Sequence, residues 1–227
     1  MYTETATQQF LAQHIDHTLL KPEATPEQIQ RLCEEALQYQ FAAVCVNPCY
    51  VGLAARILKG SNIQVATVIG FPLGATLTEA KVYEAHLAID HGARELDMVL
   101  NIGFLKAGEH SKVESEIRKI VELAHERNAI VKVIIEIGLL SEPEIAAAAQ
   151  VVTQAGADFI KTSTGFLSRG VQLEDIHLLR RLVGDNVQIK ASGGIRDAQF
   201  ALQLLKAGAT RLGTSSSVQL MQQLQSS

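Results

Sequence analysis

The segment Ala155-Gly156-Ala157-Asp158-Phe159-Ile160-Lys161 decides the fold, because two other segments of the chain repeat its pattern. The two counterparts are His91-Gly92-Ala93-Arg94-Glu95-Leu96-Asp97 and Ala207-Gly208-Ala209-Thr210-Arg211-Leu212-Gly213. In each, a glycine suited to a left-handed helix cap follows a stretch of helical period. The residue five places beyond that glycine occupies an equivalent position in all three segments. The pattern indicates one helix-to-strand unit repeated along the chain.

Apolar, β-branched runs elsewhere predict further strands, and with a short first strand at 14–17 we count eight strands that alternate with helices. The other runs are 42–46, 64–69, 130–137 and 187–191. Thr76-Leu77-Thr78-Glu79 predicts a capping box that opens a helix ending near Gly92. Eight units without a Gly-x-Gly-x-x-Gly loop favour a closed (β/α)8 TIM barrel over a doubly wound sheet of five or six strands.

Length and composition predict one globular domain over residues 1–227, with a helical N-terminal extension at 1–13 and a flexible polar tail at 222–227. The formal net charge of −4 does not favour a nucleic-acid partner. No run approaches the ~18 apolar residues of a membrane span, and the N-terminus lacks a signal-peptide pattern. We therefore expect a protein of the cytoplasm.

The three cysteines are too few for a disulfide framework and suit a reducing compartment. Cys45 and Cys49 have no second Cys/His pair at zinc-ligand spacing. We therefore expect structural thiols, no metal and no cofactor.

Side chains alternate between the two faces of a strand, so one parity faces the helices and the other fills the barrel. In 187–192 the apolar residues Val187, Ile189 and Ala191 must face outward, which turns Lys190 inward. The same alternation predicts an interior that contains several charged residues, namely Asp16, Glu95, Asp97, Lys132, Glu136, Lys161 and Lys190. His17 has outward parity.

Such a group of charges has two interpretations. The first is an ion-pair network that neutralises itself. The second is a reactive site, because desolvation and a neighbouring cation both lower the pKa of a lysine, and a neutral amine attacks carbonyl carbon to form a Schiff base. Two lysines, Lys161 and Lys190, at matching depth near Asp97 favour the second interpretation.

The loops expected after the seventh and eighth strands are rich in glycine and serine. They read Ser192-Gly193-Gly194-Ile195-Arg196-Asp197 and Gly213-Thr214-Ser215-Ser216-Ser217. Glycines let backbone amides approach an anion, and a helix that begins directly afterwards adds its N-terminal N–H groups. Together the two loops predict a phosphorylated substrate.

At these residues the sequence resembles the deoxyribose-phosphate aldolase family over nearly its whole length. The matching segments are Ile15-Asp16-His17-Thr18-Leu19-Leu20-Lys21-Pro22, Val44-Cys45-Val46-Asn47-Pro48, Gly70-Phe71-Pro72-Leu73-Gly74, Glu95-Leu96-Asp97-Met98-Val99, Lys132-Val133-Ile134-Ile135-Glu136, Phe159-Ile160-Lys161-Thr162-Ser163-Thr164-Gly165, Ile189-Lys190-Ala191-Ser192-Gly193-Gly194-Ile195-Arg196 and Gly213-Thr214-Ser215-Ser216.

The resemblance implies a class I lyase that reversibly cleaves 2-deoxy-D-ribose 5-phosphate to D-glyceraldehyde 3-phosphate and acetaldehyde, in deoxyribonucleotide catabolism. It implies that Lys161 forms the Schiff base, that Lys190 tunes it, and that Asp97 transfers protons. It also implies a homo-oligomer, dimer or tetramer. The substrate-binding residues it implies are Asp16, Thr18, Cys45, Thr164, Gly165, Gly193, Gly194, Gly213, Ser215 and Ser216.

The sequence departs from the family at Phe166, where some relatives carry a lysine, and in lacking a terminal tyrosine that some relatives have. Phosphate charge would then be met by backbone amides and Arg196. A phosphosugar isomerase or epimerase using Glu136 as its base stays an alternative, and so does a non-catalytic phosphosugar-binding barrel.

Overall fold

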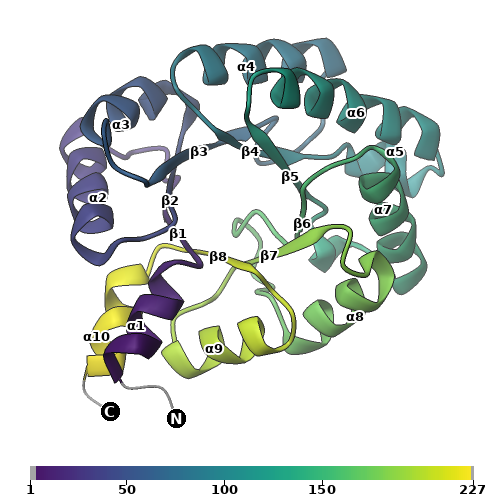
Figure 1. Cartoon of the computed structure of the whole chain (residues 1–227). Coiled ribbons are helices and arrows are strands. Elements are labelled where there is room, and N and C mark those ends of the chain that lie inside the picture. The colour runs from purple at the N-terminus through teal and green to yellow at the C-terminus, as the bar shows by residue number, and fades with distance from the viewer. Residues whose placement is uncertain (1–3, 226–227) are drawn as a thin grey trace.

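The computed structural model describes residues 4–225, with side chains from residue 7 on, and its eight parallel strands form one closed barrel. Neighbours in sequence are neighbours in the sheet, and β1 pairs with β8 to close the ring (Figure 1). The TIM barrel expected from the repeated unit is confirmed. The strands are β1 (Ile15–Leu19), β2 (Ala43–Val46), β3 (Gln64–Ile69), β4 (Glu95–Val99), β5 (Ile130–Ile134), β6 (Phe159–Lys161), β7 (Gln188–Ser192) and β8 (Arg211–Thr214).

Helices form a ring outside the strands, and the first and last helices lie side by side near the chain ends (Figure 1). The α-helices are α1 (Glu4–Ala12), α2 (Pro26–Tyr39), α3 (Val51–Ile57), α4 (Thr78–Asp90), α5 (Ile102–Lys106), α6 (His110–Glu126), α7 (Glu142–Gln154), α8 (Leu173–Val183), α9 (Ala198–Lys206) and α10 (Ser217–Gln225). Two short 3-10 helices, η1 (Pro48–Tyr50) and η2 (Ile137–Leu139), follow β2 and β5.

The repeated glycines have the conformation that the sequence pattern requires. Gly92, Gly156 and Gly208 all have positive φ, at 113°, 78° and 117°. They follow α4, α7 and α9, and each lets the chain turn from a helix into the next strand. The recurrence of one local turn therefore produces the recurrence of one helix-to-strand unit.

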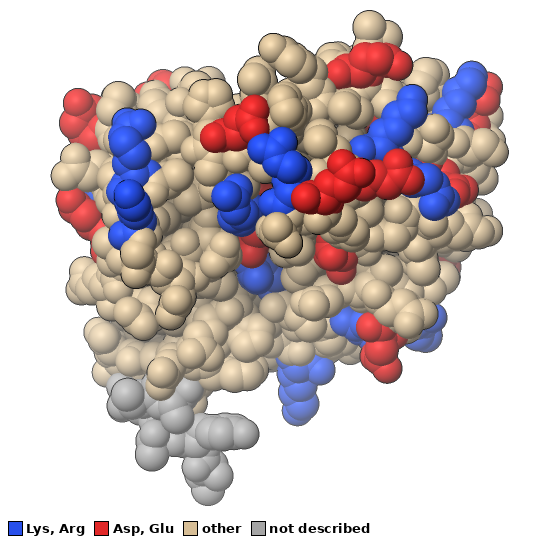
Figure 2. Space-filling view, turned by 45° about the horizontal axis from the view of Figure 1, so that its top comes forward, with Lys and Arg blue, Asp and Glu red and all other residues tan. Residues whose placement is uncertain are grey.

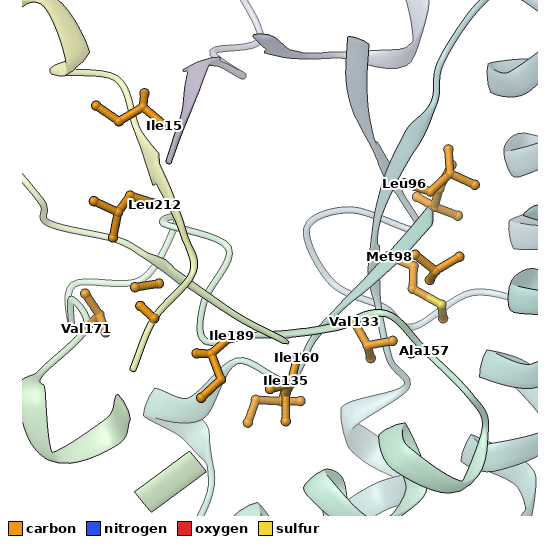
Figure 3. Packing of buried hydrophobic residues seen from close by; sticks show 14 of the residues in the cluster. Ile15, Leu96, Met98, Val133, Ile135, Ala157, Ile160, Val171, Ile189 and Leu212 are labelled. Carbon is orange, nitrogen blue, oxygen red and sulfur yellow. The ribbon is translucent and has the colours of Figure 1, made fainter. Parts of the chain in front are cut away.

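The alternation of side chains along the strands is also confirmed. Figure 3 shows Leu96 and Met98 on the side of β4 that faces the helices, and both are fully buried there. Ile160, Ile189 and Leu212 belong to the same outer core. Burial of these side chains between sheet and helices, roughly 1.5–3 kcal/mol for each large one, leaves the other parity for the barrel interior.

The barrel interior is divided into an apolar part and a charged part. Small side chains from β2 and β3, among them Ala43, Cys45, Ala66 and Val68, form a cluster against which Phe71 packs. The remaining strands contribute the charged side chains described below. Chemistry that needs charges is thus confined to one side of the barrel.

One local prediction was wrong. Helix α4 begins at Thr78 behind the extended residue Leu77, and no capping box forms at Thr76. Thr78, the first residue of the helix, instead donates its hydroxyl to Glu116 of α6 at 3.4 Å. The predicted tail is helical up to Gln225, because Leu224 is buried in the core and the Gln223 side chain accepts a hydrogen bond from the amide of Ala198. The last two residues of that prediction lie outside the described residues.

The surface carries charges of both signs. On the face in Figure 2, Lys and Arg side chains are interspersed with Asp and Glu, and neither sign covers the face alone. Within residues 4–225, no helix has the length and hydropathy needed to cross a membrane.

Candidate active site

Seven charged side chains from six strands meet inside the barrel. All are buried except Arg211, whose side chain is 16% exposed. We call this group the interior charge cluster; it consists of Asp16, Glu95, Asp97, Lys132, Lys161, Lys190 and Arg211.

Asp97 of β4 lies at the centre of this cluster. Its Oδ1 accepts a hydrogen bond from Lys132 Nζ at 2.8 Å, and its Oδ2 accepts from Lys161 Nζ at 2.7 Å and from Lys190 Nζ at 2.6 Å. Burial favours the protonated acid, but the three ammonium groups outweigh burial and hold the pKa of Asp97 well below its usual range. Asp97 is therefore a carboxylate that contacts two lysines through one oxygen.

The other two carboxylates connect the cluster to its far end. Asp16 binds Lys190 and lies 2.6 Å from Arg211 Nη1, and Glu95 lies 2.6 Å from Lys132 Nζ and 2.9 Å from Arg211 Nη1. The cluster thus contains four basic groups and three acids. With every group ionised it carries one positive charge in excess, which favours loss of a proton from one of the lysines.

The two lysines that share Asp97 Oδ2 differ in their surroundings. Burial lowers the pKa of Lys161, Asp97 raises it and Lys190 lowers it, and the net pKa lies below the usual value for lysine. Burial also disfavours the Lys190 ammonium, but Asp16 and Asp97 together raise its pKa above the usual value. Lys161 is consequently the lysine that more readily becomes a neutral amine.

A pocket of about 320 Å³ opens at the carboxyl ends of β6, β7, β8 and β1. Among the described members of the interior charge cluster, Lys161 alone lines it. The other lining residues are Thr18, Leu19, Leu20, Lys21, Thr164, Gly165, Phe166, Ser192, Gly193, Gly194, Ile195, Arg196, Gly213, Thr214, Ser215 and Ser216. A ligand in this pocket reaches the Lys161 amine without entering the rest of the cluster.

The rim of the pocket carries features suited to an anion. Gly193 and Gly194 have φ of 94° and 76°, and α10 begins at Ser217 directly after the β8 loop. The Asp197 side chain caps α9 by accepting from the Phe200 amide at 2.8 Å, so the N-terminus of α9 already has a carboxylate. The α10 end, with Arg196 among the lining residues, is the better place for an anion.

The predicted substrate-binding residues fall into two groups. Thr18, Thr164, Gly165, Gly193, Gly194, Gly213, Ser215 and Ser216 all line the pocket. Asp16 lies below it in the interior charge cluster. Cys45 is buried in the small apolar cluster, where burial raises the pKa of its thiol to about 11.

Glu136 does not join the lysines, although alternation placed it with them. Strand β5 ends at Ile134, and Glu136 takes a left-handed conformation with φ of 51°. Its carboxylate accepts hydrogen bonds from the amide of Thr164, at 3.2 Å, and from the Thr164 hydroxyl. Glu136 therefore holds the loop after β6.

Two cations that the sequence argument did not assign belong to the site. Arg211 lies in the interior charge cluster and Lys21 lines the pocket. Arg211 was detectable, because outward parity at Leu212 requires Arg211 and Gly213 to point inward. Lys21 follows β1 in a loop, where alternation does not apply.

Phe166 also lines the pocket, and its ring meets Phe71 edge-on with centroids 5.1 Å apart.

His17 has the outward position expected of it: its ring contacts Ser217 Oγ and Glu35 Oε2, at 2.9 and 2.8 Å. In the part of the chain that the structure describes, no group of three or more His, Cys, Asp or Glu residues is placed to hold a metal ion.

The fold and site together define a TIM-barrel protein with a buried lysine of lowered pKa at a pocket formed by the carboxyl ends of its strands. A family model described as DeoC/LacD family aldolase matches residues 10–219. The chain belongs to this aldolase family.

Its relatives have one name in common. A Desulfitobacterium hafniense protein named deoxyribose-phosphate aldolase is 56% identical over 211 residues, which are 93% of this chain and 97% of that protein. A Thermococcus gammatolerans protein of the same name is 53% identical, over 93% of this chain and 95% of that protein.

Solved structures agree with the family assignment. The tetrameric deoxyribose phosphate aldolase of Aeropyrum pernix superposes with a TM-score of 0.88 at 35% identity, and 97% of each chain is covered. An aldolase designated QR15 superposes with a TM-score of 0.91 at 39% identity, over 95% of this chain and 96% of the other.

Proposed function

We propose that this aldolase cleaves 2-deoxy-D-ribose 5-phosphate reversibly to D-glyceraldehyde 3-phosphate and acetaldehyde through a Schiff base on Lys161. One observation carries the proposal: the only lysine of the described cluster that reaches the pocket has a lowered pKa and shares its carboxylate with a second lysine. The names of relatives more than 50% identical supply the substrate.

In the proposed reaction, the neutral Lys161 amine attacks C1 of the open-chain aldehyde, and loss of water gives an iminium ion. A base removes the proton of the C3 hydroxyl, the C2–C3 bond breaks, and its electron pair moves into the enamine on Lys161. Glyceraldehyde 3-phosphate leaves. Protonation of the enamine at C2 and hydrolysis then release acetaldehyde and regenerate the amine.

Asp97 and Lys190 are the proposed proton-transfer groups, since both lie within hydrogen-bond reach of one another beside Lys161. Asp16 holds Lys190 in place. Thr18, whose hydroxyl donates to the Asp16 carbonyl at 2.8 Å, would orient a substrate hydroxyl at the pocket wall. Cys45 would close the apolar side of the interior as a neutral thiol.

The phosphate would bind at the rim of the pocket, against backbone amides and the start of α10. Its charge would be met by Arg196 and Lys21, which line the same pocket. The residues assigned to it are Gly165, Gly193, Gly194, Gly213, Ser215 and Ser216, and Thr164 would bind another part of the substrate.

We propose that this protein forms a homo-oligomer and that it is located in the cytoplasm. The tetrameric state of the Aeropyrum pernix aldolase supports self-association. The free thiols of Cys33, Cys45 and Cys49 suit a reducing compartment.

The proposal is tested by incubating the purified protein with 2-deoxyribose 5-phosphate, with and without EDTA, and quantifying both aldehydes by NMR. We expect equal amounts of acetaldehyde and glyceraldehyde 3-phosphate, at the same rate in both samples. Conversion to another five-carbon phosphate without acetaldehyde would indicate an isomerase. Binding of the sugar phosphate with no conversion would indicate a sensor.

A further inference from the structure

The interior charge cluster has an end that the proposed mechanism does not use. Arg211 and Glu95 are the first residues of β8 and β4, at the amino ends of the strands, whereas the pocket lies at the carboxyl ends. The Arg211 guanidinium lies 2.9 Å from Glu95 and 5.7 Å from the ring centroid of Phe159. A buried glutamate and a largely buried arginine are costly unless they have partners or a role.

Contacts lead from this pair to the reactive lysine by two routes. One passes from Arg211 through Asp16 and Lys190 to Asp97. The other passes from Glu95 through Lys132 to Asp97. Both routes end on the carboxylate that accepts the hydrogen bond of Lys161.

The strand register places the charges close enough to affect one another. Arg211 is the β-sheet partner of Lys190, and Lys190 is the partner of Lys161. Two strand spacings amount to about 10 Å, a distance at which two charges in a protein interact by an amount equal to about one pKa unit.

The charged groups around Lys161 come from the interior charge cluster and from the pocket, where Lys21 after β1 and Arg196 after β7 line the same space. Asp97 of β4 contacts it, Lys190 of β7 binds the same Asp97 oxygen, and Lys190 and the Cys45 thiol of β2 both affect its pKa. Arg211 in turn is faced by Asp16 of β1 and Glu95 of β4. Changing either member of the distal pair therefore changes the net charge that surrounds Lys161 without touching the pocket.

We propose that Arg211 and Glu95 act as a balanced positioning pair: either charge alone would shift the pH range in which Lys161 is a free amine, and each offsets the effect of the other. The inference rests on the proposed role of Lys161 as the nucleophile. The proposal predicts that removing Arg211 and removing the Glu95 charge shift the titration of Lys161 in opposite directions. Removing the arginine makes the cluster neutral and favours the Lys161 ammonium, whereas removing the glutamate charge raises the excess to two and disfavours it.

The titration of Lys161 can be measured without catalysis, by brief labelling with acetic anhydride from pH 5 to 10 and peptide mass mapping. We expect the Lys161 midpoint to move up by about one pH unit in Arg211→Met and down by about one unit in Glu95→Gln. The double variant should return to the wild-type midpoint, and Arg211→Lys should stay near it.

A surface ion pair provides the matched control. Arg127 and Asp90 form an exposed pair between α6 and α4. Arg127→Met and Asp90→Asn change the total charge by the same amounts and should leave the Lys161 midpoint in place. Circular dichroism establishes that each variant is folded, and Glu95→Gln and Arg211→Lys keep the side-chain shape or charge if Arg211→Met does not fold.

The proposal is overturned if both single changes move the midpoint in the same direction, if neither moves it, or if the double variant does not return it. Borohydride trapping with substrate, carried out on the same variants, separates the two proposals. If the two variants show opposite shifts but the wild-type protein gives no trapped adduct, the positioning pair is retained and the Schiff base is refuted.

Discussion

Two regions of this molecule bury ionised side chains, and they differ in what surrounds them. Between α4 and α6, Lys81 Nζ donates to Glu116 Oε1 at 2.7 Å and to the carbonyl of Val99 at 2.8 Å. Glu116 also accepts from the amide of Asn101 at 3.2 Å. Here one cation meets one anion, and two backbone groups and the Thr78 hydroxyl satisfy the rest.

The interior charge cluster has four basic groups and three acids, and one of its lysines opens on a pocket. A lowered pKa does not separate the regions, because burial lowers the pKa of Lys81 as well as that of Lys161. What distinguishes Lys161 is the excess charge around it and its access to a ligand. The comparison teaches that a buried lysine is a candidate nucleophile only where its charge is uncompensated and its amine is reachable.

The largest expected effect is that of Lys161→Leu. Turnover of 2-deoxyribose 5-phosphate should fall by at least about 10⁴-fold, the scale observed when a covalent nucleophile is removed. The protein should still fold, because the remaining cluster has three basic groups and three acids. Steady-state kinetics and circular dichroism check both statements, and activity within tenfold of wild type would remove Lys161 from the mechanism.

The buried pair Lys81–Glu116 should respond in the opposite way, with a loss of stability and little loss of activity. Lys81→Met leaves the Glu116 carboxylate buried without its cation, so the free energy of unfolding should fall by about 3–5 kcal/mol. The kcat of the folded fraction should remain within a factor of two or so of wild type, since the pair lies outside the pocket. Urea unfolding and kcat at low temperature measure the two effects; a large loss of kcat at unchanged stability would contradict the distinction between the regions.

Lys190→Leu tests the tuning of the reactive lysine. Lys190 lowers the pKa of Lys161, and without Lys190 the Asp97 Oδ2 atom would accept a hydrogen bond from Lys161 only. Both changes should raise the pKa of Lys161. Activity requires the free amine and should therefore fall most at neutral pH, by about 10²–10³-fold, and recover in part as the pH is raised. The pH profile of kcat is the measurement, and a uniform loss at every pH would argue against a tuning role.

The smallest expected effect concerns the rim. Gly194 has φ of 76°, so Gly194→Ala strains the loop that would bind phosphate. The KM for 2-deoxyribose 5-phosphate should rise about tenfold, equal to about 1.4 kcal/mol, while cleavage of 2-deoxyribose, which has no phosphate, should change little. Gly60→Ala is the matched control: its φ is 87°, it is remote from the pocket, and no atom lies within 4 Å of the added Cβ. Equal losses for both sugars would place the phosphate elsewhere.

The barrel and most of the interior could be predicted because both follow from regular periods. The cap glycines repeat, and outward Ile160 and Ile189 dictate inward Lys161 and Lys190. Alternation fails where a strand ends early. At Glu136 the left-handed backbone turned the carboxylate toward Thr164, and no pattern of apolar residues announces that change.

The individual ion pairs could not be predicted from the sequence. Which carboxylate oxygen meets which lysine depends on the stagger of the strands, and β4 and β6 are separated by β5. The Lys81–Glu116 pair was not predicted either, because its two residues are 35 positions apart and meet through a tertiary contact between two helices. Sequence periodicity indicates the face on which a side chain lies; the partner on that face comes from packing.

The most direct test of the central claim is reduction with borohydride in the presence of 2-deoxyribose 5-phosphate, followed by peptide mass mapping. The account predicts one reduced adduct, on Lys161, formed equally with EDTA present and absent from Lys161→Leu. Lys81, buried and with a lowered pKa but outside the pocket, should remain unmodified. An adduct on Lys190 or Lys132, or none in a protein that cleaves the sugar phosphate, would contradict it.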